Sequence, residues 1–171
     1  KESGRTLDLG AGQGRNSLLL AEHGFEVTAV DVSRIGIERI NQEASRRGLS
    51  IKTKIADIRT ARLSKSYDIV LMLFVLHHLR YTEARLLLDK VKRRTAESGL
   101  HIIAVFTQAG DFYQSNPRSS HFYPEPGELK RIYGDWEILR WSERTTIAYQ
   151  RAKNGRPMRN KTSFLIARKS P

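Results

Sequence analysis

The stretch TLDLGAGQGRNSLLLAEHGFEVTAVDVS, residues 6–33, decides the fold of this chain. Three glycines, Gly10, Gly12 and Gly14, follow a short apolar run and precede the helical run SLLLAEHG. A Gly-rich turn between a strand and a helix brings the backbone close to a ligand. Residues 25–32 are rich in β-branched side chains and predict a second strand. We therefore expect a β-α-β unit that holds a ligand at the turn.

The alternation of apolar runs and helical patterns continues to residue 107, with further strands predicted in IKTKIAD, YDIVLMLFVL and GLHIIAVFT. Residues 108–128 follow as a long loop, a kind of segment that is usually functional or mobile. Two strand-like runs then flank Asn154-Gly155, a strong hairpin signal. The sequence predicts one α/β domain over residues 1–171. Its doubly wound, Rossmann-like sheet is seven-stranded and mostly parallel, and it ends in an antiparallel hairpin.

Composition bounds the class of protein. The 171 residues include no Cys, no apolar window of transmembrane length and no secretory signal, so we expect a cytoplasmic protein with no membrane partner. The net charge of +12 is high, and from Arg140 onward nine basic residues face the single acid Glu143. This charge fits a solvated basic surface, an acidic substrate or a nucleic acid.

Two acids mark the carboxyl edge of the predicted sheet, where open α/β sheets bind ligands. Asp31 ends the second strand and can accept both ribose hydroxyls, and Asp57 closes the third strand within reach of an adenine amino group. The glycine spacing G-x-G-x-G, followed by Arg15, differs from the G-x-G-x-x-G of a pyrophosphate-binding turn. A nucleoside that carries a carboxylate and an amine but no phosphate would satisfy these groups, and S-adenosylmethionine (SAM) is such a molecule. The simpler alternatives are glycines that serve packing and an Asp57 that caps a turn.

The motifs LDLGAGQG, VDVS and AD resemble the SAM-binding motifs of class I methyltransferases. Residues 5–169 are similar to the tellurite-resistance (TehB-like) methyltransferase family, and GQGRNS and GEL…Y…W carry the more specific likeness. Many members have Cys where this chain has Ala11, a change that removes nothing needed for SAM. Members also carry a helical segment before the first strand; this chain has no room for it, so we expect that covering helix to be absent. The cofactor-binding residues that we predict are Asp8, Gly10, Ala11, Gly12, Gly14, Arg15, Asn16, Asp31, Val32, Asp57, Ile58 and Phe74.

The resemblance also implies an acceptor site beside the hairpin, where the family has a His-Arg pair. Gln150-Arg151 matches that pair, so we predict Arg151, together with His78 after the fourth strand, as catalytic. Arg144, Arg156 and Arg159 are further cations that could hold an oxyanion. A metal at His77-His78 is disfavoured because no third ligand is spaced to help; we expect one ring to pack and the other to face the acceptor. His121, Tyr113 and Tyr123 are predicted to form a lid, and Trp136 and Trp141 to pack in the core or at an edge.

The segment after the fourth strand bears on the class of methyl acceptor. Adenine and amide N-methyltransferases typically carry N-P-P-[YF] there, whereas this chain has LFVLHHL. A chalcogen oxyanion such as tellurite or selenite needs no base, because its chalcogen lone pair attacks directly. The leading hypothesis is therefore a SAM-dependent methyltransferase for a small anionic acceptor. The alternatives are another small acceptor such as a thiol or halide, RNA, or a non-catalytic SAM-binding module.

Overall fold

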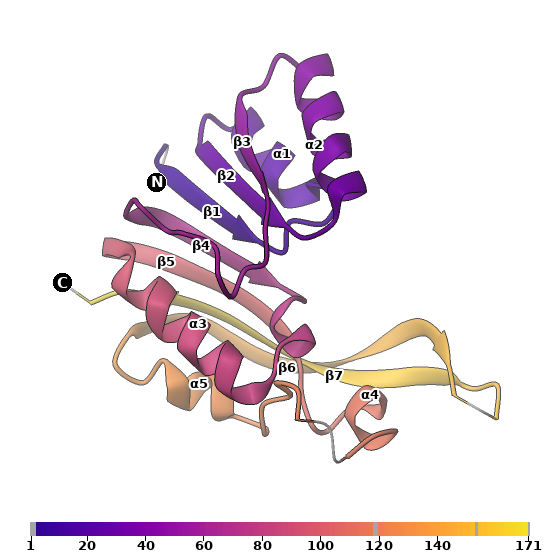
Figure 1. Cartoon of the computed structure of the whole chain (residues 1–171). Coiled ribbons are helices and arrows are strands. Elements are labelled where there is room, and N and C mark those ends of the chain that lie inside the picture. The colour runs from indigo at the N-terminus through magenta and orange to yellow at the C-terminus, as the bar shows by residue number, and fades with distance from the viewer. Residues whose placement is uncertain (1–2, 118–119, 153, 171) are drawn as a thin grey trace.

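The computed structural model describes residues 3–117, 120–152 and 154–170 and contains one seven-stranded sheet in the order β3-β2-β1-β4-β5-β7-β6 (Figure 1). The strands are β1 Arg5–Leu9, β2 Glu26–Asp31, β3 Ile51–Ile55, β4 Tyr67–Leu73, β5 Thr95–Phe106, β6 Glu137–Arg151 and β7 Pro157–Arg168. The helices are α1 Arg15–Glu22, α2 Arg34–Arg46, α3 Tyr81–Arg93, α4 Asp111–Gln114 and α5 Glu128–Ile132, with a 3₁₀ turn η1 at Leu76–His78.

The pairing of the strands confirms the predicted architecture. β1, β2, β3, β4 and β5 pair in parallel, whereas β7 runs antiparallel to both β5 and β6. The β6–β7 hairpin extends past the end of β5, and α4 lies beside β7 (Figure 1). The sheet is therefore mostly parallel and ends in the expected antiparallel hairpin.

The core lies around the central strands β1 and β4. Leu7, Leu9, Val70 and Met72 are completely buried, as the middle of a parallel sheet covered on both faces requires. The helices add further buried apolar side chains, which are Ile37 and Ile40 of α2 and Leu87, Leu88 and Val91 of α3. These strands form a rigid base whose carboxyl ends carry the site.

Helix α5 lies next to α3 and packs beside the β7 end of the sheet (Figure 1). Lys92 of α3 donates to the carbonyl of Ile132 at 2.7 Å. Trp136 is buried, and Trp141 on β6 is 37% exposed beneath Lys130, so the predicted core and edge roles of the two tryptophans are confirmed.

No helix in residues 3–117, 120–152 and 154–170 combines the length and the apolar character needed to cross a membrane.

Candidate active site

The three glycines of the turn after β1 have different surroundings. All three have positive φ, and a side chain at Gly10 would overlap Val75 while one at Gly14 would overlap Ile40 of α2. A Cβ at Gly12, by contrast, would meet nothing within 4 Å. Gly10 and Gly14 therefore allow close packing, and Gly12 leaves open space beside the turn.

Asp31 is fixed at the end of β2 by two backbone donors. The N–H of Gly12 and the N–H of Ser33 each donate to its carboxylate at 2.8 Å. These contacts tie the acid to the glycine turn. Because each carboxylate oxygen can accept more than one hydrogen bond, Asp31 retains capacity for ligand hydroxyls.

Asp8 lies beneath the turn. It is 2% exposed and accepts a hydrogen bond of 2.6 Å from the hydroxyl of Ser17. Burial raises the pKa of Asp8 to about 6, with a smaller contribution from the charge of Asp31, and the Ser17 bond opposes that rise. Asp8 thus supports α1 rather than lining a cavity.

A cavity of about 580 Å³ opens at this edge of the sheet, and we refer to it as the cofactor cavity. Its lining includes seven of the predicted cofactor residues, which are Gly10, Gly12, Asp31, Val32, Asp57, Ile58 and Phe74. Arg59, Val75, His78 and Leu79 complete it. Five predicted residues are not in this lining, because they form the turn and the supporting layer behind it: Asp8, Ala11, Gly14, Arg15 and Asn16.

Asp57 is already engaged. The guanidinium of Arg59 donates to both oxygens of its carboxylate, at 3.0 and 2.9 Å from Nε, and the Arg59 N–H donates at 2.9 Å. These contacts, led by the side-chain hydrogen bond, lower the pKa of Asp57. Arg59 also pairs with Glu83 at 2.9 Å. Asp57 therefore does have the turn contact that was the alternative to cofactor binding, and its predicted contact with adenine stays a prediction.

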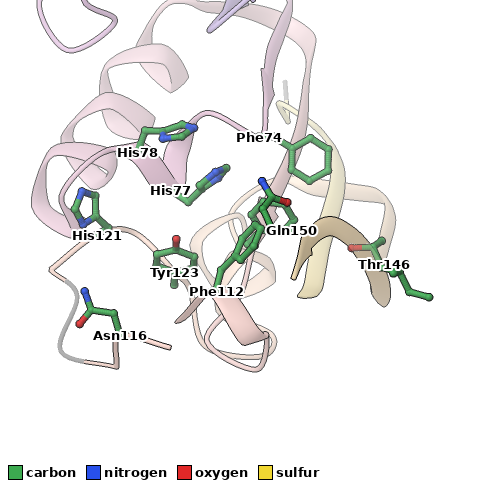
Figure 2. Close-up of a pocket in the computed structure, with 11 residues that line it drawn as sticks. Phe74, His77, His78, Phe112, Asn116, His121, Tyr123, Thr146 and Gln150 are labelled. Carbon is green, nitrogen blue, oxygen red and sulfur yellow. The ribbon is translucent and has the colours of Figure 1, made fainter. Parts of the chain in front are cut away.

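A second cavity, of about 760 Å³, adjoins the first and shares Phe74 and His78 with it; we call it the acceptor cavity (Figure 2). Phe74 follows β4 with φ +57, a conformation that a bulky residue rarely adopts and that is concentrated at functional sites. The other residues in the lining are His77, Phe106, Phe112, Asn116, His121, Tyr123, Thr146, Ile147 and Gln150. The shared wall is where a group could pass from one ligand to the other.

The histidine pair lies at the acceptor cavity. His77 and His78 both line it, with ring centroids 4.3 Å apart, and the His77 ring also packs against Phe106. Both rings reach the cavity because the chain leaves β4 in the 3₁₀ turn η1 instead of continuing as a strand. Burial, followed by the neighbouring His78 and His121, lowers the pKa of His77 to about 4, so this ring is neutral at pH 7.

The predicted arginines of the hairpin are not brought to the acceptor cavity. Gln150 lines it, whereas Arg151 turns back and donates to the carbonyl of Gly155 at 2.8 Å. Arg156 pairs with Asp111 at 2.6 Å, and neither Arg144 nor Arg159 is in the lining. The hairpin was expected beside the acceptor and does border it, but through Thr146, Ile147 and Gln150.

The loop before α5 forms the opposite wall. Asp111 accepts from the Arg156 side chain and from the Arg159 N–H at 2.6 Å, and Asn160 accepts from the Phe112 N–H at 2.8 Å. These contacts attach α4 to β7. They place Phe112, with the expected loop residues His121 and Tyr123, around the cavity (Figure 2).

Tyr113 instead packs against Tyr123, with ring centroids 5.7 Å apart. No local sequence pattern identifies Phe112, Phe106 or Thr146 as site residues, because they converge only when the loop docks on the hairpin.

The comparisons with known proteins agree with this geometry. The family model described as tellurite resistance protein TehB matches residues 2–166. The chain is 31% identical over 165 residues to a Haemophilus influenzae protein described as a probable SAM-dependent methyltransferase TehB, covering 96% of this chain and 57% of that protein. The chain thus spans little more than half of this relative.

Solved structures show the same fold. The crystal structure of TehB from Haemophilus influenzae superposes with a TM-score of 0.86 at 29% identity, over 98% of this chain and 58% of that one. A coclaurine N-methyltransferase bound to N-methylheliamine and S-adenosylhomocysteine gives a TM-score of 0.76 at 19% identity, over 99% and 68%. Because the family model covers nearly the whole chain, this protein belongs to the TehB tellurite-resistance family, whose relatives and structural neighbours are SAM-dependent methyltransferases.

Proposed function

We propose that this chain is a SAM-dependent methyltransferase domain that transfers a methyl group to a small acceptor. The observation that carries the proposal is the pair of adjoining cavities that share Phe74 and His78. One cavity is lined by the glycine turn and Asp31, and the other by aromatic and uncharged polar side chains. Two ligands held in these cavities would meet at the shared wall.

Two features of the cofactor cavity support SAM as its ligand. Gly12 leaves open space where a side chain would intrude, and Asp31 is held ready to accept ribose hydroxyls. Bound there, SAM supplies a methyl group on a sulfonium sulfur. A lone pair of the acceptor attacks the methyl carbon in line, and S-adenosylhomocysteine leaves. The task of the protein is to hold the acceptor close to the methyl carbon and collinear with the leaving sulfur.

For the acceptor we propose a chalcogen oxyanion such as tellurite or selenite, which is supported by the family description. Such an acceptor attacks through its own lone pair and requires no general base. A second candidate is a larger uncharged acceptor. It is favoured by the volume of about 760 Å³ and by the apolar side chains of Phe106, Phe112 and Ile147.

The test is turnover with a panel of acceptors. The protein is mixed with SAM and, separately, with selenite, tellurite, a small thiol, iodide and a short RNA, and S-adenosylhomocysteine is measured. Formation with selenite or tellurite supports the oxyanion, and formation only with another member of the panel replaces it. Tight binding of S-adenosylhomocysteine without turnover of any member would indicate a non-catalytic module.

Asp31→Ala tests the cofactor site independently of the acceptor. Loss of the carboxylate should leave the ribose hydroxyls unpaired and weaken S-adenosylhomocysteine binding by about 1–3 kcal/mol, measured by calorimetry. Unchanged affinity would remove Asp31 from the site.

A further inference from the structure

His77 has a defined place in the acceptor cavity. Its ring packs against that of Phe106 of β5, with the centroids 4.8 Å apart. The ring centroid of Tyr123 is 6.0 Å away, and both His77 and Tyr123 border the cavity (Figure 2). The titratable groups around it are His78 on η1 and His121 and Tyr123 on the loop. Packing on several sides restricts the rotation of the ring, so its two nitrogens have distinct surroundings.

The two nitrogens differ in what they can reach. Nδ1 is buried and has no hydrogen-bond partner among the described residues. Nε2 has no hydrogen-bond partner among the described residues either, but unlike Nδ1 it is not buried. It therefore keeps access to open space. The open space beside this ring is the acceptor cavity.

This difference selects a tautomer. A neutral imidazole carries one N–H and one lone pair, and a buried N–H without an acceptor is rarer in proteins than an acceptor that is left unsatisfied. The proton therefore belongs on Nε2, and the lone pair on the buried Nδ1. Burial and the neighbouring histidines keep the ring neutral by lowering its pKa to about 4.

We propose that His77 is held as the Nε2–H tautomer and that this N–H is a neutral hydrogen-bond donor to an oxygen of the methyl acceptor. The proposal rests on the methyltransferase function proposed above. Because its lone pair is buried, His77 cannot take a proton from the acceptor. It instead orients the acceptor so that another atom faces the methyl group.

The tautomer can be tested without turnover, by long-range ¹H–¹⁵N correlation of the histidine rings, with His77 assigned through His77→Gln. We expect a protonated Nε2 and an unprotonated Nδ1 at pH 7, and the same pattern at pH 5.5. A proton on Nδ1, or an imidazolium at pH 7, would overturn the proposal even if selenite is methylated.

Three substitutions test the role in binding. His77→Phe keeps the ring packing and removes the unpaired Nδ1, so the folded protein should be at least as stable, and kcat/KM for selenite should fall by roughly 10-fold. His77→Gln places an amide N–H near the position of Nε2 and should recover most of the loss. His77→Asn places it near Nδ1 and should not. Activity of His77→Phe equal to that of the unmodified protein would exclude the donor role.

Should selenite not be methylated, the same three variants are compared with whichever acceptor of the panel is turned over. The ring correlation requires no acceptor, so it tests the tautomer of His77 independently. The acceptor panel tests the methyltransferase function.

Discussion

Gly12 and Gly48 share a backbone conformation but differ in their distance from the cofactor cavity, which Gly12 lines and Gly48 does not. Their φ angles are +56° and +65°, and an added Cβ would meet nothing within 4 Å at either position. Gly12 lines the cofactor cavity, whereas Gly48 follows α2 and is outside that lining. The pair therefore separates backbone strain from ligand contact.

We expect Gly12→Val and Gly48→Val to lose similar stability, about 1–2 kcal/mol, because both force a side chain into the left-handed region. Only Gly12→Val should lose S-adenosylhomocysteine binding, since its side chain occupies space that the ligand needs. Circular dichroism and thermal melts measure the fold, and calorimetry measures the affinity. Equal affinity in the two variants would mean that the turn serves packing alone.

Asp8 gives the stability of the protein a pH dependence of unusual sign. Its pKa is about 6 in the folded protein, against 3.8 for an ordinary Asp. Between these values the folded state binds the proton more readily than the unfolded state, so the contribution of Asp8 to stability falls as the pH rises.

Asp8→Asn should remove this dependence while keeping an oxygen that can accept from Ser17. The free energy of unfolding of the variant, relative to the unmodified protein, should increase by about 3 kcal/mol from pH 3.5 to pH 7, at 1.36 kcal/mol per unit of pKa. Denaturant titrations at the two pH values measure it.

Glu43→Gln is the control, because hydrogen bonds from Arg46 and then Arg47 lower the pKa of Glu43 to about 2. The free energy of unfolding of Glu43→Gln, relative to the unmodified protein, should decrease from pH 3.5 to pH 7. The charged carboxylate stabilises the fold above its unfolded pKa, and that effect is lost as the pH falls. An equal stability difference between Asp8→Asn and the unmodified protein at the two pH values would show that the pKa of Asp8 is not raised by folding.

At the scale of the elements, the contact between α4 and β7 shapes the acceptor cavity. Asp111 holds the side chain of Arg156 and the backbone of Arg159, and these bonds lower its pKa to about 2. The Asp111 carboxylate is therefore ionised at neutral pH. Phe112 follows directly and lines the cavity.

Asp111→Asn weakens the ion pair and should raise the KM for the acceptor several-fold, because Phe112 is no longer held in place. The affinity for S-adenosylhomocysteine should not change, since the cofactor cavity lies on other strands. Glu137→Gln is the control: Glu137 of β6 pairs with Arg168 of β7 at 3.3 Å, and neither residue is in the lining of either cavity. A KM change of equal size in both variants would indicate a general effect on the hairpin.

The elements also show what sequence patterns could predict. The strands β1, β2 and β4 and the cofactor edge were predictable, because apolar runs alternate with amphipathic helices and the carboxyl ends of parallel strands must meet. The end of β4 was not predictable. LMLFVL contains no local stop signal, and the left-handed turn at Phe74 is imposed by tertiary structure.

The acceptor cavity was the least predictable part of the site. Arg151 was expected there from its match to a family motif, yet Gln150 is the one in the lining. Alternation along β6 sends neighbouring side chains to opposite faces, and register shifts between Ile147 and Arg151 decide which face each one takes. A motif match carries no information about that register.

At the scale of the whole molecule, the charge of +12 is not concentrated at the site. Arg62, Lys90, Arg93 and Arg94 surround a depression at the end of α3. Arg94 accepts a backbone hydrogen bond from Tyr67 at the start of β4, whereas Phe74 and the cavities lie beyond its other end. Arg93 and Arg94 therefore lie at the amino end of β4, whereas the proposed chemistry lies at its carboxyl end.

The double variant Arg93→Glu/Arg94→Glu should elute from heparin at lower salt, because fewer cations remain to displace counterions. Its kcat/KM for selenite should equal that of the unmodified protein, since neither residue touches a cavity that we assign to a ligand. Loss of methylation of the short RNA together with heparin affinity would instead favour RNA as the acceptor.

The shared wall between the two cavities has a consequence for how such a domain diversifies. Among the residues that the structure describes, Phe74 and His78 alone belong to both linings, and the remaining contacts of the acceptor cavity come chiefly from η1, β5, the loop after it and β6. The glycine turn and Asp31 come from β1, β2 and their connections. We therefore expect substitutions among the acceptor-cavity residues from His77 onward to change which acceptor is methylated and to leave binding of the methyl donor unchanged. Phe74 and His78 are the exceptions, because a substitution at either position alters both cavities.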